Sequence, residues 1–539
     1  MKIISAMRDW CENTHIVRER KLVFFLVTVA ISLSAVVQSV FAEDIYQLNA
    51  SMPSGVDLTA MSGYYADRMK GPTASYVEFK GPLTVDASVS PSNPFRLIGC
   101  GANIRAIKGS GFYTIPLMMY NDDGVTKTSV LDFWDGGVYS GECLDIGKYN
   151  KVRYGYGSSG TFRFDCATIN LHDGAIIEKA GSNAGVSLGR NHQVSVSVIG
   201  GSSLTGTSFI YLGEQNKETE NQVTAFMGIT NATVTAGGTA YNKTFVMLFG
   251  VAGSGENCRV VLGSGGVINA NCMTHHGTGS SRITFDGGQY KSLGDTTLPL
   301  FYVHGLSYSG SWSNPRINVE GINGNPIDVE IAYDRNLADG VGANDYRQVN
   351  FTGIGGFTKR GVGVLYFNRL YGGSTCDYTG PTTVLGGGIV VTNSVFKPGR
   401  GELALSEGAF LDLNGFDVEF CGATGAGVIK NGATTDSVLT LGYGNADSSL
   451  TVAVGEHISI VKTGMGTLTV SGAALANACN LTVAEGKVVF AGDSSSYGTV
   501  TVKSGAILDV TGTVFSCARC VKERGGKILP PKGTIVSFR

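Results

Sequence analysis

The stretch EGAFLDLNG (407–415) decides the fold, because the chain spells almost the same nine residues again as SGAILDVTG (504–512). Both copies keep Gly-Ala, then Leu-Asp, then a final Gly. In each copy apolar residues occupy alternate positions, and a period of two predicts a β-strand. The glycines at both ends allow the positive φ angles that a tight corner needs. The repeated unit is therefore a short strand between two corners.

Two further blocks repeat in the same order, so the match is more than a chance copy of one strand. FTKRGVGVLYF (357–367) returns as IVKTGMGTLTV (460–470), and TVLGGGIVV (383–391) returns as TVAEGKVVF (482–490). The first pair of blocks shares four matched positions, Lys359/Lys462, Gly361/Gly464, Gly363/Gly466 and Leu365/Leu468. Within each copy, successive blocks start 22 to 26 residues apart. Self-similarity at such a period is typical of solenoids and propellers.

Short strands of this kind cannot bury their inward face alone, and they do so by stacking on the next turn of the chain. The sequence has neither the leucine-rich-repeat frame nor the signature of a propeller blade. We therefore predict an all-β protein, a single-stranded parallel β-helix (solenoid) with terminal caps. About 15 to 20 stacked turns at ~4.8 Å each would form a rod of roughly 70 to 95 Å.

The alternation also predicts which side chains face the core, because successive residues of a strand point to opposite sides. The expected inward set is Leu411, Leu413, Leu468, Val470, Leu508 and Val510, and the expected solvent-facing set is Asp412, Thr469 and Asp509.

Taken together, the Lys-x-Gly-x-Gly-x-Leu corner, the Thr-Val step, the Gly-rich turn before Val-Val and the LDLNG strand resemble the autotransporter-associated β-strand repeat of bacterial surface proteins. The resemblance covers about residues 350–512, and before that only the style continues, as in ATVTAGG (232–238). It implies a right-handed parallel β-helix of the passenger-domain type. An autotransporter also carries a C-terminal barrel of many strands. Only the 27 residues 513–539 follow the last block, so we expect no barrel in this chain.

Composition agrees with a packed, corner-rich fold. The chain has 77 glycines in 539 residues, about twice the usual ~7%. A disordered low-complexity chain is the alternative, but 43% hydrophobic residues and sustained alternation argue against it. Lys and Arg number 41 against 43 Asp and Glu. This near balance gives no electrostatic footprint for nucleic acid.

The N-terminus carries an export signal. A short basic segment ending at Lys21 precedes LVFFLVTVAISLSAVV, and Val40-Phe41-Ala42 ends in a small residue, which is typical of a secretory signal peptide cleaved after Ala42. Met7 is an alternative start of translation, because the segment before the apolar run is long for a secretory signal. The alternative is an uncleaved membrane anchor, because residues 22–42 are just long enough to span a bilayer. The expected organisation is a signal peptide (1–42), an N-terminal segment or cap (43–105), irregular β-helix turns (106–349), the repeat region (350–512) and a C-terminal cap or tail (513–539).

The cysteines are scattered rather than arranged as a disulfide framework. Ten of the eleven follow Ala42, about one per turn or fewer, so most are expected to be small buried residues. Cys517 and Cys520 form the one close pair. A local disulfide is the preferred interpretation, since a zinc site normally needs a second pair.

The sequence offers few candidates for catalytic or metal-binding residues. Cys272, His275 and His276 offer metal-ligand types, but adjacent strand residues face opposite sides, so we expect a solvated turn instead of a metal site. The densest acidic cluster is Asp122, Asp123, Asp132 and Asp135 with Trp134, in a Gly- and Asn-rich setting typical of turns. Known nucleotide, hydrolase and metalloprotease motifs are absent from the sequence, as is the calcium-binding nonapeptide. We predict no catalytic, cofactor-binding or metal-binding residue.

These features predict an exported, noncatalytic surface or secreted repeat protein, a stalk or an adhesive surface, whose partner is a glycan or a surface protein. The alternative is a polysaccharide-active β-helix enzyme, either a lyase or a glycoside hydrolase, and a third reading is a structural shell component. Fold alone does not decide among them. We expect no nucleic-acid partner, and membrane contact only through the N-terminal segment if it is not cleaved. The sequence does not indicate an oligomeric state.

Overall fold

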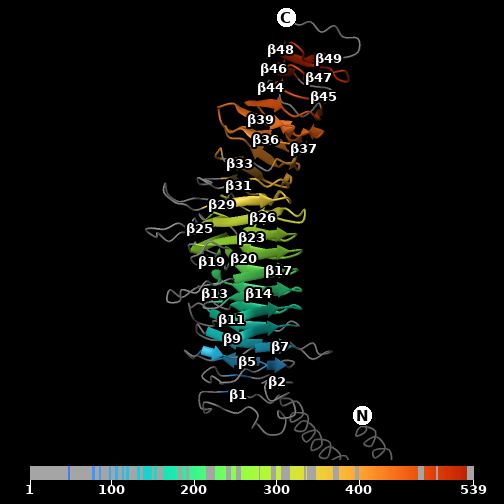
Figure 1. Ribbon diagram of the computed structural model, residues 1–539. Coiled ribbons are helices and arrows are strands. Elements are labelled where there is room, and N and C mark those ends of the chain that lie inside the picture. The colour runs from blue at the N-terminus through green and yellow to red at the C-terminus, as the bar shows by residue number, and fades with distance from the viewer. Residues whose placement is uncertain are drawn as a thin grey trace, which may run out of the picture.

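The protein is a long stack of short strands that lie across its axis (Figure 1). The computed structural model describes the strands named below between residues 47 and 154, and then residues 162–179, 185–189, 193–213, 225–237, 245–250, 256–277, 279–292, 299–304, 316–332, 335–336, 348–367, 375–394, 400–471, 479–492 and 496–530. Within these residues the chain is nearly all β, with one short 3-10 turn at Tyr443–Asn445. The predicted signal peptide and the residues Asp122, Asp123, Trp134 and Asp135 lie outside the described residues.

One sheet, which we call face 3, runs almost the whole length of the stack. Its strands are β5 (Asn103–Ala106), β8 (Val130–Phe133), β10 (Lys151–Tyr154), β12 (Ile176–Lys179), β15 (Ser203–Gly206), β18 (Thr233–Ala236), β21 (Val267–Ala270), β24 (Gln289–Ser292), β27 (Ile327–Ile331), β30 (Phe357–Arg360), β32 (Thr382–Val384), β34 (Leu403–Leu405), β37 (Ala423–Gly425), β40 (Ser448–Leu450), β43 (Thr467–Ser471), β45 (Lys487–Ala491), β47 (Ile507–Asp509) and β49 (Lys527–Leu529).

A second series of strands, face 2, precedes face 3 in the turns up to β30 and again from β36 (Val418–Phe420) onward. It contains β2 (Tyr76–Glu78), β4 (Arg96–Ile98), β7 (Leu117–Tyr120), β14 (Val194–Ile199), β17 (Ala225–Thr230), β20 (Glu256–Gly263), β23 (Ser280–Asp286), β26 (Arg316–Gly321) and β29 (Gln348–Gly353), and after a change of sheet β36 (Val418–Phe420), β39 (Ser437–Leu441), β42 (Ile458–Lys462), β44 (Asn480–Val483), β46 (Ser496–Val502) and β48 (Ser516–Lys522).

In the remaining series, face 1, each strand precedes the face 2 strand of its turn where both are present. It contains β6 (Phe112–Thr114), β13 (Val186–Leu188), β16 (Phe209–Leu212), β19 (Phe245–Gly250), β22 (Cys272–Gly277) and β25 (Phe301–His304), and then β28 (Arg335–Asn336), β31 (Val364–Phe367), β33 (Gly388–Val391), β35 (Phe410–Asp412), β38 (Val428–Lys430) and β41 (Ala453–Val454). Two long strands, β9 (Val138–Ile146) and β11 (Phe162–Leu171), run through faces 1 and 2, and a small separate pair joins β1 (Gln47–Leu48) to β3 (Thr84–Val85).

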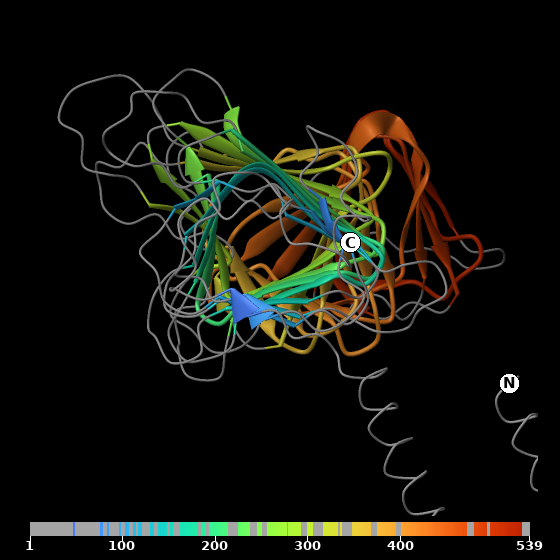
Figure 2. The ribbon, with the colours of Figure 1, turned by 90° about the horizontal axis from the view of Figure 1, so that it is seen from below.

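Strands of one turn pair in parallel with the equivalent strands of the next, as β15, β18 and β21 do. Figure 2 looks along the stack, where successive turns superimpose as flat sides and the orange and red turns are displaced from the green ones. Face 3 contains eighteen strands, within the 15 to 20 turns predicted, and at ~4.8 Å per step they span roughly 80 Å. These parallel sheets are consistent with a parallel β-helix.

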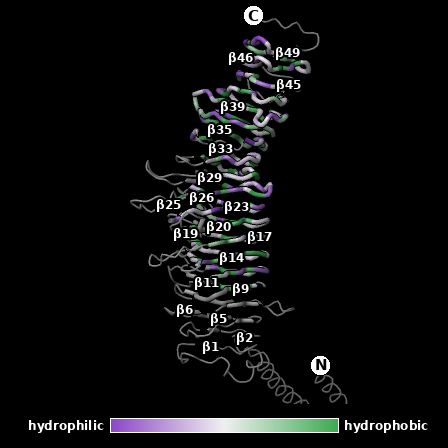
Figure 3. The backbone as a smooth tube through the Cα atoms, in the orientation of Figure 1, coloured by the Kyte–Doolittle hydropathy of each residue, from purple (hydrophilic) through white to green (hydrophobic). Residues whose placement is uncertain are grey.

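The core lies inside the stack and consists of inward columns of apolar side chains. One column on face 2 places fully buried residues of six successive turns in register: Val196, Met227, Val260, Ile283, Val319 and Phe351. Polar residues alternate with such positions along the strands, and Figure 3 shows the resulting mixture of hydrophobic and hydrophilic residues. Each turn thus buries its apolar side against its neighbours, as the period of two predicts.

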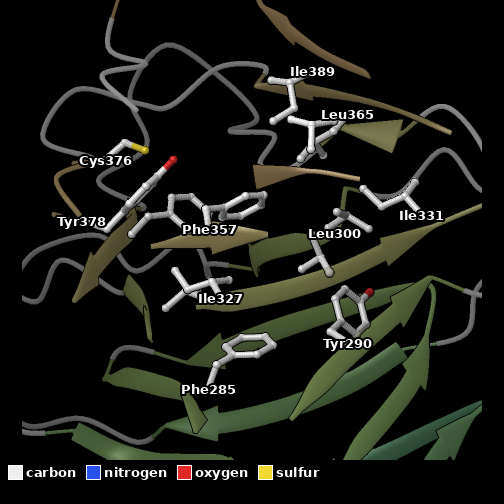
Figure 4. Close-up of a cluster of buried hydrophobic side chains, with 14 of the residues drawn as sticks. Phe285, Tyr290, Leu300, Ile327, Ile331, Phe357, Leu365, Cys376, Tyr378 and Ile389 are labelled. Carbon is white, nitrogen blue, oxygen red and sulfur yellow. The ribbon is translucent and has the colours of Figure 1, made fainter. Parts of the chain in front are cut away.

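Aromatic rings fill the interior where the repeat region begins. Phe351 contacts Phe301, Phe357 and Phe367 edge-on, at ring-centroid distances of 5.9, 6.5 and 6.3 Å. Figure 4 shows this part of the core, with Phe357 and Tyr378 side by side. Edge-to-face contacts of this kind stabilise beyond simple burial.

The register prediction is largely confirmed. All six expected inward residues, Leu411, Leu413, Leu468, Val470, Leu508 and Val510, are at most 2% exposed. Thr469 and Asp509 lie on the outer side and are half-buried. The expectation for Asp412 is wrong, because this side chain is buried. The turn at 431–433 of the next rung covers it, and Gly432 donates its N–H to the Asp412 carboxylate at 2.8 Å.

The two copies of the repeat do not occupy the same faces. Block 357–367 forms β30 on face 3 and β31 on face 1, whereas block 460–470 forms β42 on face 2 and β43 on face 3. The repeated sequence therefore encodes a strand, a corner and a strand, and the fold uses this unit at two different corners.

Strand stacking continues past the last repeat block. Strand β48 pairs with β46, and β49 pairs with β47, both in parallel. Among the described residues, no helix is both long and apolar enough to cross a membrane.

Candidate interaction surface

Outward charged side chains from three adjacent turns come together on face 3. We call this group, Gln289, Lys291, Asp328, Glu330 and Arg360, the charged ladder. It lies on strands β24, β27 and β30, where the register places Lys291 opposite Glu330 and Glu330 opposite Arg360. Alternation along IDVEI (327–331) puts both carboxylates on one side of the sheet while Ile and Val face the core.

Each carboxylate of the charged ladder has a cationic partner. Arg360 donates its Nε–H to both carboxylate oxygens of Asp328, at 2.8 and 2.9 Å, and this hydrogen bond raises the pKa of the guanidinium. Lys291 lies 3.2 Å from Glu330. Gln289 donates its amide N–H to Asp328 at 3.4 Å. The ladder is therefore internally neutral and offers no unpaired acid or base for proton transfer.

The sequence alone does not reveal the charged ladder, because its members are spread from residue 289 to residue 360. The available signal was the alternation of acidic and apolar residues in IDVEI, together with Lys and Arg at outward positions of neighbouring strands. Without the register between turns, nothing shows that these residues meet.

The histidine segment forms a strand, which corrects the expectation of a solvated turn. His275 and His276 belong to β22, and His275 is fully buried, in register between Leu248 and Val303 of the core. The Nδ1 atom of His275 is hydrogen-bonded to the Ser281 hydroxyl at 2.7 Å. Burial lowers the pKa of His275 to about 4, helped by the adjacent His276. Cys272 is buried as well, and the described residues contain no group of three or more His, Cys, Asp or Glu side chains placed to hold a metal ion.

Of the acidic cluster, only Asp132 lies in a described strand, β8. The register places it opposite Arg105 of β5 and Arg153 of β10. Asp132 therefore lies in register between arginines of the two adjacent strands, and the other members of the cluster lie outside the described residues.

The predicted disulfide between Cys517 and Cys520 is not formed, and both residues carry free thiols on β48. Burial raises the pKa of both thiols, that of Cys520 to about 11. The expectation of small buried cysteines is confirmed for Cys258, Cys376 and Cys479, each at most 4% exposed.

Two lysines at matched positions of the repeat have a structural role that the sequence did not suggest. Lys359 and Lys462 are both fully buried. The ammonium group of Lys359 donates to the carbonyl oxygens of Gly361, Gly363 and Gly386. That of Lys462 donates to carbonyl oxygens in its own corner, Thr463 and Gly464, both at 2.7 Å, and to Glu485 of the next turn at 3.4 Å.

These lysines hold the corners of the stack. Gly361 and Gly464 have φ angles of 80° and 73°, a conformation that turns their corner carbonyls toward the lysine. Burial lowers the pKa of Lys462, with Glu485 and Asp447 acting in the opposite direction. The Lys-x-Gly pattern is therefore a corner clamp with a structural role.

The structure defines an all-β protein built from stacked parallel strands. Comparison with known proteins gives one distant match. No protein-family model matches the chain, and no solved structure matches it. The chain is 30% identical over 201 residues to the adhesin BmaC autotransporter of Brucella suis biovar 1 (strain 1330). The match covers 34% of this chain and 6% of that protein, so the chain spans a small share of its relative's length.

Proposed function

We propose that the protein is an exported, noncatalytic repeat protein of the cell surface or the secreted fraction, serving as a stalk or an adhesive surface. Its fold in this proposal is a single-stranded, right-handed parallel β-helix of the autotransporter passenger type. The stacked parallel strands and the match to an autotransporter adhesin support it. The N-terminal signal (1–42) would direct export, and the partner would be a glycan or a surface protein.

The observation that carries the proposal is the internal neutrality of the charged ladder. Acid–base catalysis on a polysaccharide needs groups within hydrogen-bond reach of the substrate, with the proton acceptor or donor free to act. On face 3 the two carboxylates, Asp328 and Glu330, are held by Arg360 and Lys291 instead. Such a surface presents paired charge and polar side chains over three adjacent turns, which suits display and binding.

A polysaccharide-active enzyme is the second candidate, because the ladder does bring two carboxylates and two cations together from three adjacent turns. In this reading Asp328 and Glu330 would leave their partners when substrate binds. A purely structural shell component is the third candidate and predicts neither binding nor turnover.

The test immobilises the full chain and presents uronate-containing and neutral polysaccharides with calcium, while new reducing ends are measured. We expect retention of a polysaccharide without turnover. Turnover that disappears in the Asp328→Asn, Glu330→Gln double variant would replace the adhesive function with the enzyme. An Asp132→Ala, Asp135→Ala double variant applies the same test to the acidic cluster. Neither retention nor turnover would favour the structural shell.

A further inference from the structure

Face 2 carries an exposed aromatic ring beside a glycine of the same strand. Phe226, on β17, is 38% exposed although its neighbours along the strand are buried. A Cβ atom at Gly228 would lie 3.3 Å from Cε1 and 3.5 Å from Cζ of the ring, so the ring leans over the bare backbone of this glycine. The ring is thus partly covered next to Gly228 and partly open to solvent.

Arginine residues follow this ring on the next three strands of face 2. Arg259 of β20 is the register partner of Phe226, and Arg282 of β23 is the partner of Arg259. Arg316 begins β26, the strand after β23. It is the register partner of Ser280 and lies two residues before Asn318, the partner of Arg282. On the other side of the ring, the exposed Ser195 of β14 is the register partner of Phe226.

The positive charge of this region is only partly neutralised. Glu320 binds Arg282 at 2.9 Å and also accepts the hydroxyl of Thr284 at 2.9 Å. Arg259 and Arg316 are exposed and form no ion pair with a described residue. Asp286 lies at the far end of β23, about 13 Å along the strand from Arg282, and accepts from Asn325 at 2.9 Å. The guanidinium group of Arg259, on the strand next to the ring, and that of Arg316, three strands further along face 2 than Phe226, are therefore available to anionic groups.

We propose that Phe226, Arg259 and Arg316 form a binding platform for an anionic glycan, with one uronate unit stacked on the ring, its carboxylate on Arg259 and a carboxylate further along the glycan on Arg316. This rests on the proposed adhesive function and names its ligand class. A pyranose offers a flat C–H face that suits the negative face of an aromatic ring. Arginine pairs with carboxylates through two parallel hydrogen bonds. A uronate combines both features in one rigid unit, whereas an acidic peptide satisfies the arginines and leaves the ring without a flat partner.

The experiment measures binding of the full chain to an oligogalacturonate and to its methyl-esterified form, which has the same backbone without charge. We expect the charged oligomer to bind at least tenfold more tightly, with an advantage that shrinks as salt screens the guanidinium groups. Phe226→Ala and Arg259→Gln should each weaken this binding about tenfold, the loss expected for one charge-assisted or stacking contact. Ile199→Ala, which removes another exposed apolar side chain of face 2, is the matched control and should change nothing.

Two further variants separate the platform from a folding defect. Phe226→Tyr keeps the ring and should retain binding, whereas Gly228→Val should lift the ring and weaken binding while the melting temperature stays within a few degrees. Equal affinity for the esterified oligomer, or unchanged binding by Phe226→Ala, overturns the platform. So does polyglutamate that competes as well as the oligogalacturonate. If the platform variants still adhere to another surface, the adhesive function stands and only this site is wrong. If the unaltered chain turns over polysaccharide, the adhesive function itself fails.

Discussion

At the scale of single residues, two fully buried ionisable groups, Lys462 and His275, solve the same problem in different ways. An ionised group inside a protein is costly unless hydrogen bonds replace its lost water. Lys462 meets this requirement with three carbonyl oxygens at a corner. His275 meets it by staying neutral and sharing one hydrogen bond with Ser281. Each arrangement leads to a measurable prediction.

Replacing Lys462 by Met should lower the free energy of unfolding by about 2 to 4 kcal/mol, because carbonyl groups at the buried corner lose their donor. The stem of the side chain is kept, so packing changes little. Lys503→Met is the control, because Lys503 is an exposed lysine of the same region and should change stability by less than about 0.5 kcal/mol. Denaturant unfolding measures both, and equal losses would show that Lys462 is not a clamp.

The buried His275 should make the protein less stable in mild acid. Its folded pKa of about 4 lies below the ordinary 6.5, so between these values the unfolded chain binds more protons and stability falls as pH decreases. The contribution is present above pH 6.5, and about 3 kcal/mol is lost by pH 4. His275→Leu should flatten this part of the stability curve relative to the unaltered chain. If His275→Leu kept the acid sensitivity of the unaltered chain, the loss of stability would belong to other groups.

At the scale of elements, the LDLNG and LDVTG segments show that two matched strands of the repeat, β35 and β47, end in the same way. Asp412 and Asp509 each accept the backbone N–H two residues ahead, at 3.0 and 3.1 Å, and each meets a lysine of an adjacent strand. Lys487 lowers the pKa of Asp509 by its hydrogen bond. The aspartate thus closes the strand locally and ties it to the neighbouring turn.

For this strand we expect Leu411→Ala to cost about 2 to 5 kcal/mol, as a core truncation does. Asp412→Asn should cost well under 1 kcal/mol, because both backbone donors bind the same oxygen, Oδ1, which an amide can supply. Asp412→Ala should cost about 1 to 3 kcal/mol, since the two N–H groups then lose their acceptor. Thermal or denaturant unfolding checks the order, and a loss for Asp412→Asn as large as that for Leu411→Ala would contradict the observed register.

At the scale of the whole molecule, the stack should behave as a rod in solution. The eighteen strands of face 3 span roughly 80 Å, far more than one turn measures across. Small-angle scattering should therefore give a pair-distance distribution with a long tail. A symmetric distribution typical of a globule would be incompatible with the stack.

Several features of the fold could be predicted from short stretches of sequence. The alternation around Leu411, Leu468 and Leu508 fixed which side chains enter the core, and the spacing of the blocks fixed the length of a turn. Both are local properties, because a strand's two sides and its closing corner depend on residues that are adjacent in the chain.

Only the tertiary structure decided which outward residues meet. Asp412 is covered because the next turn passes over it, Lys291 reaches Glu330 across 39 positions of sequence, and Arg259 remains unpaired beside Phe226. These outcomes depend on the register between turns, and that register depends on the lengths of the corners and loops that join them. The sequence by itself therefore determined the kind of rung this protein repeats, and the stacking of the rungs determined its surface, because side chains from different turns become neighbours only when the turns are aligned.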